Sequence, residues 1–248
     1  MSAQMEFYND DLERESAHHG LHDPHGRSSS LADIILGGQD GLVNVLGIVL
    51  GVAVASADPR MILTAGMAAA FAESVSMGAV AYTSTLAQAD FYESERSREH
   101  RHIQRYPKHE QEEIRAIYES KGFEGELLEQ IVNTITSDKE VWVRVMLAEE
   151  HQLTPVDRSK ARSSAVIVAL SAIIGSLIPL LPFIFWPLPV SMWLSLAISA
   201  LTLFAVGVYK AGVTTIGKPA RSGMEMAVIG TVSAMIGYAI GLLFKTLT

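Results

Sequence analysis

Residues 163–209 read SSAVIVALSAIIGSLIPLLPFIFWPLPVSMWLSLAISALTLFAVGVY, and none of these 47 residues is charged. A helix that crosses a lipid bilayer needs about 20 predominantly apolar residues. The stretch is long enough for two such helices, and Pro187 and Pro189 interrupt it in the middle. We therefore predict two membrane-spanning helices, at about 163–186 and 190–209, joined by a tight turn.

Three further apolar stretches, at about 31–57, 61–87 and 224–244, have the length and composition of membrane spans. The predicted fold class is therefore an all-α integral membrane protein with five transmembrane helices, in contact with the lipid bilayer. The chain has no cysteine, which excludes disulfides and thiolate metal sites. Its formal net charge of −8 argues against nucleic acid as a partner.

The acidic residues are concentrated in two regions, because residues 1–30 and 90–158 hold 22 of the 27. No proline occurs between Met61 and Tyr106, so we expect the second span to continue as one helix of about 45 residues that leaves the membrane. Helices are predicted next at about 108–120, 124–136 and 138–152. The resulting organisation is a histidine-containing tail (1–30), spans one and two (31–89), a three-helix insert (90–158) and spans three to five (159–248).

Lysine and arginine in short loops indicate the orientation, because they favour the cytoplasmic side. A cytoplasmic N-terminus leaves only Arg60 and Lys245 in the outer flanks. It also places the 90–158 insert in the cytoplasm. The first thirty residues lack the pattern of a secretory signal. An N-terminus without targeting features is typical of a protein of a bacterial or archaeal plasma membrane. Location in an organelle membrane is the alternative. The inner flanks then hold Arg27, Arg158, Lys160, Arg162, Lys210, Lys218 and Arg221.

Two carboxylates fall inside predicted spans: Asp40 in the first and Glu73 in the second. An ionised carboxylate in lipid costs about 3 kcal/mol and needs a partner or a water-filled path. None of the predicted spans contains a lysine or arginine. Asn44 and Met77 follow the two acids by one helical turn and share their faces. Together these four residues could bind a first-row divalent metal ion. The alternatives are protonated, hydrogen-bonded acids and a methionine that only fills space.

The insert also contains side chains that can bind metal ions, here outside the membrane. They are spaced three or four residues apart on several predicted helices. Such spacing can converge on a metal pair or cluster, as in helical bundles that bind iron. A solvated helix surface with ion pairs is the alternative, because arginines lie nearby. The histidines of the tail are a weaker indication of metal binding. The potential ligands of the insert are Glu95, Glu99, His102, Glu110, Glu113, Met146, Glu149 and Glu150, and those of the tail are His18, His19, His22 and His25.

Glycines recur at four-residue spacing in the first and last spans, at Gly37 and Gly41, at Gly47 and Gly51, and at Gly237 and Gly241. In lipid this spacing allows helix backbones to approach closely. Packing within one subunit and packing between subunits both remain open.

The order of several motifs resembles the vacuolar iron transporter family, from about residue 31 almost to the end of the chain. The motifs are DGLV at 40–43, TAG at 64–66, AESVSMG at 72–78, ADFY at 89–92, RE at 98–99 and PLLP at 179–182. The resemblance implies a homodimer of five-span subunits that moves Fe²⁺, and often Mn²⁺, out of the cytoplasm in exchange for protons. It also implies a cytoplasmic three-helix metal-binding insert.

By motif position the resemblance implies membrane ligands at Asp40 and Met77. In the insert it implies ligands at Glu99, Glu110, Glu113, Met146 and Glu150. The chain departs from some plant relatives at two places. It has Ala69 where they carry a glutamate, with its own acid at Glu73, and it has His102 in place of a further glutamate.

We therefore predict a proton-coupled transporter of Fe²⁺, with Mn²⁺, Zn²⁺ or Co²⁺ as other ions that the sites could bind. Its role would be detoxification or storage of iron and manganese, and the chain is expected not to be an enzyme. Metal ions and protons would compete for the same carboxylate oxygens, which is the physical basis of exchange. The alternatives are a membrane-anchored di-iron ferroxidase and a metal sensor.

Overall fold

The computed structural model describes residues 24–214 and 218–247, and within them every regular element is a helix. The histidines of the tail lie outside the residues whose side chains are described. The chain divides into two compact units, Met1–Val80 with Ser163–Thr248 and Ala81–Arg162. We describe each unit by itself.

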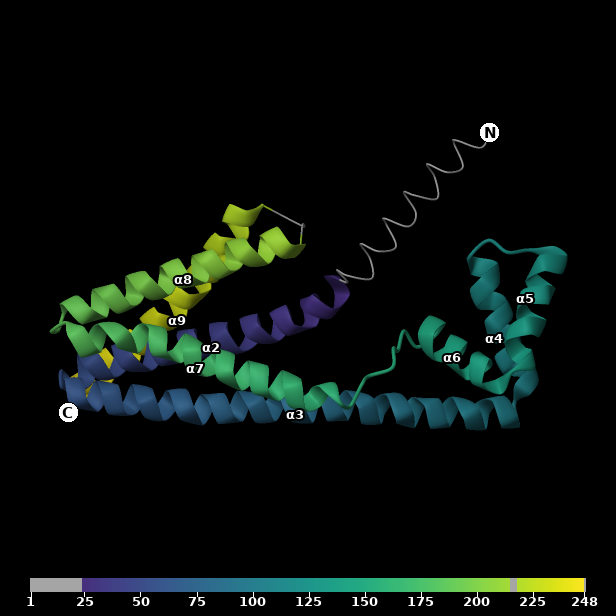
Figure 1. Cartoon of the computed structure of the whole chain (residues 1–248), viewed down its shortest axis with the longest axis horizontal. Coiled ribbons are helices and arrows are strands. Elements are labelled where there is room, and N and C mark those ends of the chain that lie inside the picture. Colours follow the sequence, from purple (N-terminus) through teal and green to yellow (C-terminus); the bar gives the residue numbers. More distant parts are fainter. Residues whose placement is uncertain (1–23, 215–217, 248) are drawn as a thin grey trace, which may run out of the picture. The chain divides into compact units, whose positions relative to one another are not determined.

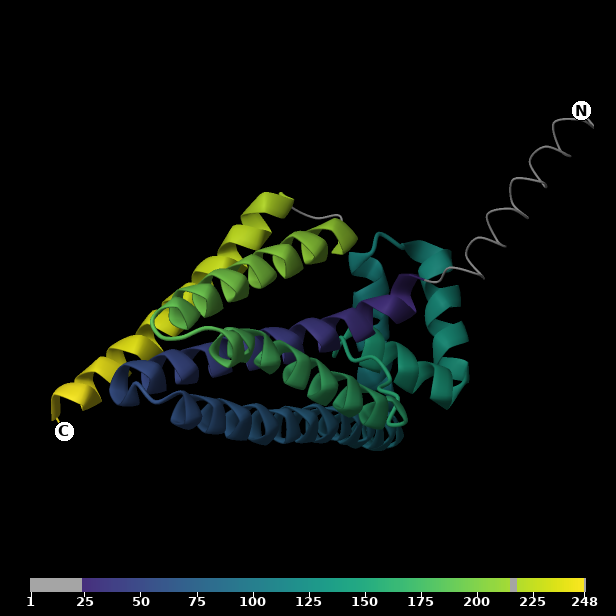
Figure 2. The ribbon, with the colours of Figure 1, turned by 60° about the vertical axis from the view of Figure 1, so that its left-hand side comes forward.

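Five helices are long and apolar enough to cross a membrane, which confirms the predicted fold class. Each is longer than the apolar stretch that predicted it, because a helix can continue into polar flanks beyond the lipid. Helices α8 and α9 lie side by side, and α2 packs against α9 (Figures 1 and 2). The five helices are α2 (Pro24–Ser56), α3 (Pro59–Arg105), α7 (Lys160–Phe185), α8 (Val190–Thr214) and α9 (Pro219–Leu247).

Helix α3 continues without a break over 47 residues, which corresponds to about 70 Å at 1.5 Å per residue. The absence of proline between Met61 and Tyr106 predicted this continuity. The helix ends at Arg105 and the next helix begins at Pro107, a residue suited to the first turn of a helix. Residues 81–105 of α3, called here its outer half, belong to the second unit.

Close contact between α2 and α9 depends on glycine. A methyl group added at Gly237 would overlap the backbone oxygen of Gly47, and one at Gly241 would overlap that of Gly51. Both contacts lie within one chain, so the four-residue spacing of these glycines serves packing inside the subunit. No small shift of a side chain could relieve the overlap, because the obstructing atoms are backbone atoms.

We expect Gly241→Ala to destabilise the protein by about 1–3 kcal/mol, because α2 and α9 must move apart. The matched control is Gly212→Ala in α8, where an added Cβ meets nothing within 4 Å. That change should raise stability slightly, since alanine is the better helix former by roughly 1 kcal/mol. Thermal unfolding in detergent, followed by tryptophan fluorescence, measures both. Equal melting temperatures for the two variants would contradict the packing argument.

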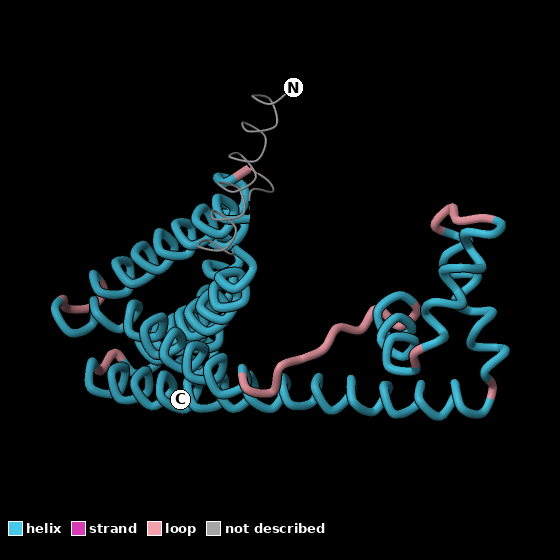
Figure 3. Tube along the Cα trace, turned by 45° about the vertical axis from the view of Figure 1, so that its right-hand side comes forward, coloured by secondary structure: helices cyan, strands magenta, loops and turns pink. Residues whose placement is uncertain are grey.

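Helices α4 (Pro107–Ser120), α5 (Gly125–Ser137) and α6 (Lys139–Glu149) make up the insert, joined by short turns (Figure 3). Their apolar faces form a core of their own, with Ile114, Val132 and Val143 almost fully buried. Tyr92 and Ile103 of α3 complete this core. The three helices of the insert therefore pack on residues 81–105 of α3, within the second unit.

Helix α6 ends at Glu149, three residues before the predicted end at Gln152. Gln152 has a φ of 54°, in the left-handed region that terminates helices. The amide of Leu153 donates to the carbonyl of Leu147 at 2.8 Å, and Leu153 packs on the core of the insert. Pro155 predicted that the helix ends near this point. The turn at Gln152, which the sequence did not predict, sets the direction of the His151 side chain.

Candidate metal centres

The first candidate centre lies in the membrane unit, on α2 and α3. The side-chain amide of Asn44 donates to Oε1 of Glu73 at 2.6 Å. The carboxyl group of Asp40 is near enough to interact with that of Glu73. Met77 is half-buried and follows Glu73 by one turn on α3. The structure thus brings together Asp40, Asn44 and Glu73, with Met77 on the neighbouring turn.

An open groove of about 710 Å³ runs beside this group and is lined by α2 and α9. Asp40 and Asn44 contribute polar atoms to it, and Ser233 faces them from α9. The remaining lining is apolar or glycine. Asp40 and Asn44 are exposed in the single chain. A carboxylate within a membrane span is thus accessible from a groove rather than sealed in a dry core.

The second candidate centre is a smaller cavity of about 240 Å³ in the insert. It gathers side chains from the outer half of α3, from α4 and from the end of α6. Five predicted ligands line it: Glu99, His102, Glu110, Glu113 and Glu150. Tyr106, His109, His151 and Arg98 complete the lining.

Two carboxylates of this cavity are almost completely buried, with 2% of Glu99 and 3% of Glu110 exposed. Within the described structure, Oε2 of each accepts no hydrogen bond. A buried acceptor without a donor costs about 1–3 kcal/mol, and more when it is charged. Both lie in a cavity where other ligands converge. The donor set therefore fits a cation in place of hydrogen-bond donors.

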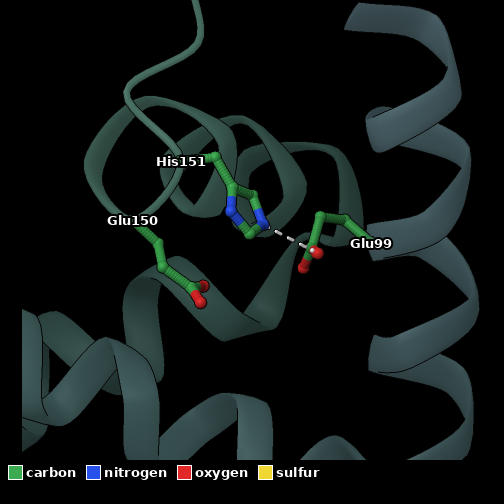
Figure 4. A group of neighbouring side chains, drawn as sticks. All are labelled: Glu99, Glu150 and His151. Carbon is green, nitrogen blue, oxygen red and sulfur yellow. Dashed lines mark hydrogen bonds and ion pairs between the residues drawn. The ribbon is translucent and has the colours of Figure 1, made fainter. Parts of the chain in front are cut away.

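The histidines connect the carboxylates into two overlapping groups. His102 lies 3.6 Å from Glu110 through Nδ1 and Oε1, and 4.0 Å from Glu99. Nε2 of His151 lies 3.0 Å from Oε1 of Glu99. The potential ligand atoms of each group lie within 4.8 Å of one another. One group consists of Glu99, His102 and Glu110. The other consists of Glu99, Glu150 and His151, which Figure 4 shows.

Burial and neighbouring charges raise the pKa values of three side chains in the cavity of the insert: Glu110, Glu150 and His151. Burial, followed by the negative charges of Glu113 and Glu99, raises the pKa of Glu110 from 4.5 to about 7. Burial and the charge of Glu113 also raise the pKa of Glu150. For His151, burial lowers the pKa, but the hydrogen bond to Glu99 and the charge of Glu150 outweigh it, so the pKa is raised. Protons would therefore compete with a bound cation for this cavity near neutral pH.

We expect divalent-metal binding to the insert to weaken by about tenfold per pH unit below pH 7, because a metal ion must displace the proton of Glu110. The same shift implies that Glu110 stabilises the metal-free protein below about pH 4.5, and that this contribution is lost as the pH rises through about 7. Equilibrium dialysis with Mn²⁺ between about pH 5 and pH 8 measures the first effect. Glu110→Gln should flatten the profile, and an affinity independent of pH in the unchanged protein would contradict the assignment.

Three predicted ligands of the insert do not line the cavity. Met146 is fully buried in the hydrophobic core. Glu149 is ion-paired with Lys121. Glu95 pairs with Arg98 at 3.6 Å, one turn before Glu99 on α3. Their role as ligands stays a prediction, and the geometry centres the site on the other five.

Sequence reasoning missed His151. It lies next to Glu150, so its position after a predicted carboxylate ligand was a usable signal. The helix was expected to continue to Gln152, which would have placed His151 on a different face from Glu150. The turn at the end of α6 brings it to Glu99 instead.

Residues 31–242 match the model of the VIT family. The chain belongs to this family. It is 32% identical over 208 residues to vacuolar iron transporter 1 of Eucalyptus grandis, which covers 83% of each chain. It is 31% identical to the vacuolar iron transporter of Plasmodium berghei over 99% of this chain and 91% of the relative. Vacuolar iron transporter 1 of Arabidopsis thaliana is 32% identical over 84% of this chain and 83% of its own length. Both candidate centres of this VIT-family chain fall within the matched residues.

Proposed function

We propose that this chain transports Fe²⁺ across a membrane, and carries Mn²⁺ as well, by exchange with protons. The observation that carries the proposal is the pair of carboxylates within the spans, Asp40 and Glu73, with Glu73 joined to Asn44 at 2.6 Å. The apolar segments that predicted the spans, at about 31–57, 61–87, 163–186, 190–209 and 224–244, contain no lysine or arginine that could neutralise them. A travelling cation or a proton supplies the missing charge. The names of the relatives, vacuolar iron transporters, support iron as the cargo.

The two centres have different tasks in this proposal. The cavity of the insert collects the ion on the cytoplasmic side, where four carboxylate and three imidazole side chains line it. Asp40, Asn44, Glu73 and Met77 then hold it during passage through the membrane. The thioether of Met77 favours a first-row transition-metal ion over Mg²⁺ or Ca²⁺, which prefer oxygen ligands alone.

Exchange follows from the competition between the two cations. When the metal ion leaves, the carboxylates of the membrane centre take up protons, because the ionised form is costly in lipid. The next metal ion displaces those protons. The direction is out of the cytoplasm, with the N-terminus and the insert on the cytoplasmic side, in line with the distribution of lysine and arginine.

A homodimer would complete the membrane centre. Asp40 lies exposed in a groove between α2 and α9. A second subunit over this groove would shield the carboxylate from lipid and enclose a polar path. We therefore propose a dimer in which α2 lies near the contact between subunits.

Transport by purified protein in proteoliposomes tests the proposal. We expect uptake of Fe²⁺ and Mn²⁺ that increases when the vesicle lumen is acidic, together with loss of protons from the lumen. Protein-free vesicles provide the control. Binding of Fe²⁺ without transport would overturn the proposal and favour a sensor. Oxygen consumption upon addition of Fe²⁺, without flux, would favour a ferroxidase.

A further inference from the structure

The end of α6 places an imidazole where the motif comparison predicted no ligand. His151 follows Glu150 at the turn that terminates the helix, and its ring points toward Glu99 of α3 (Figure 4). The left-handed backbone of Gln152 (φ 54°) costs about 1–2 kcal/mol for a residue other than glycine. The anchored side chain of Leu153 holds the turn in place. His151 is therefore held in a defined position against the cavity.

At this position the imidazole of His151 lies beside the carboxylate of Glu99 in the cavity. Oε1 of Glu99 is 3.0 Å from Nε2 of His151, whereas Oε2 of the same carboxylate is buried without a hydrogen-bond partner among the described residues. Glu150 directs its carboxylate toward the same space. One imidazole nitrogen and two carboxylates thus converge, with potential ligand atoms no more than 4.8 Å apart.

These separations suit a transition-metal ion. Bonds from such an ion to nitrogen or oxygen are about 2.0–2.2 Å long, so two of its ligand atoms lie up to about 4.4 Å apart. Small side-chain rotations are enough to bring the three ligands to this range. A neutral imidazole ligand raises the affinity of a site for Fe²⁺, Co²⁺ and Zn²⁺. Mn²⁺ gains less from it, because Mn²⁺ prefers oxygen ligands.

We propose that Glu99, Glu150 and His151 form a mixed nitrogen–oxygen metal subsite, and that His151 gives the insert a preference for ions that bind imidazole over Mn²⁺. The subsite shares Glu99 with the group of His102 and Glu110. This inference rests on the proposed function in one respect: it takes the ion bound at the subsite to be the ion that the protein transports. Its chemistry concerns binding and can be measured without transport.

The experiment is a titration of the full-length protein in detergent with Co²⁺ at about pH 8, above the ordinary pKa of an imidazole. Visible absorption of bound Co²⁺ reports its ligands, and competition with Mn²⁺ gives the ratio of the two affinities. His151→Gln keeps a hydrogen-bond donor for Glu99 but removes the imidazole nitrogen. We expect the Co²⁺ to Mn²⁺ affinity ratio to fall by about tenfold or more and the absorption bands to change.

Two further variants sharpen the result. His100→Gln is the matched control, because His100 lies near Glu140 at 3.3 Å and not in the cavity, and it should leave ratio and spectrum unchanged. His151→Glu replaces the nitrogen by an oxygen ligand and should shift the preference toward Mn²⁺, which also tests the proposal if the glutamine variant does not fold. An unchanged ratio and spectrum in the His151 variants, or a lack of Co²⁺ binding by the unchanged protein, would overturn the subsite. Flux in proteoliposomes would still decide the proposed function separately.

Discussion

Replacing Glu73 by glutamine is expected to abolish Fe²⁺ flux in proteoliposomes, and Asp40→Asn is expected to do the same. Each change removes one of the two carboxylates that would bind the transported ion, in apolar segments that contain no lysine or arginine. Truncating one partner of a buried charge pair costs about 2–5 kcal/mol. A loss of that size lowers the population of the metal-loaded state by roughly 30-fold or more. Stopped-flow uptake with a metal-sensitive dye inside the vesicles measures the flux.

A matched control for these variants is Glu225→Gln on α9. Its carboxylate is ion-paired with Arg221 at 3.0 Å and is exposed, so removing its charge should leave flux close to that of the unchanged protein. Mn²⁺ binding to the insert should also persist in all three variants, which shows that the insert of each is folded. Flux that continues in both the Asp40 and Glu73 variants would exclude the membrane centre as the path.

The second large effect is expected for Glu99→Gln in the insert. Glu99 belongs to both groups of potential ligands, so its loss should weaken metal binding to the cavity by about 100-fold. The metal-free protein should be at least as stable as before, because a buried charge beside Glu110 and Glu150 is removed. A metal ion at 100 times its dissociation constant stabilises by about 2.7 kcal/mol, or roughly 5 °C in melting temperature. That increase should vanish in the variant.

Thermal unfolding with and without Mn²⁺ measures this difference. Glu140→Gln provides the control, because this exposed carboxylate of α6 is ion-paired with Arg96 and does not line the cavity. It should keep the full metal-induced increase in melting temperature. A persistent increase in the Glu99 variant would contradict the cavity as the binding site.

The membrane unit was predictable because its signal is local. A span needs only length and apolar composition, so residues 163–209 determined two helices without reference to the rest of the chain. The absence of proline predicted the continuity of α3 in the same way. The pairing of Asn44 with Glu73 was not predictable, since residues 29 positions apart meet only when α2 and α3 pack together.

The insert shows the limit of spacing arguments. Glu149 and Glu150 are equivalent by composition, yet one pairs with Lys121 and the other lines the cavity. Residues one position apart on a helix point about 100° apart, so the face that is buried decides their roles. The same packing placed Met146 in the hydrophobic core.

By itself, the sequence determined that this chain spans a membrane with five helices, and that their apolar segments carry carboxylates but no lysine or arginine. Those properties depend on the free energy of transferring each segment from water to lipid, which is a sum over neighbouring residues. Tertiary structure alone decided which acids share a cavity and that His151 faces Glu99. Such contacts depend on the packing of helices distant in sequence and on the single turn at Gln152.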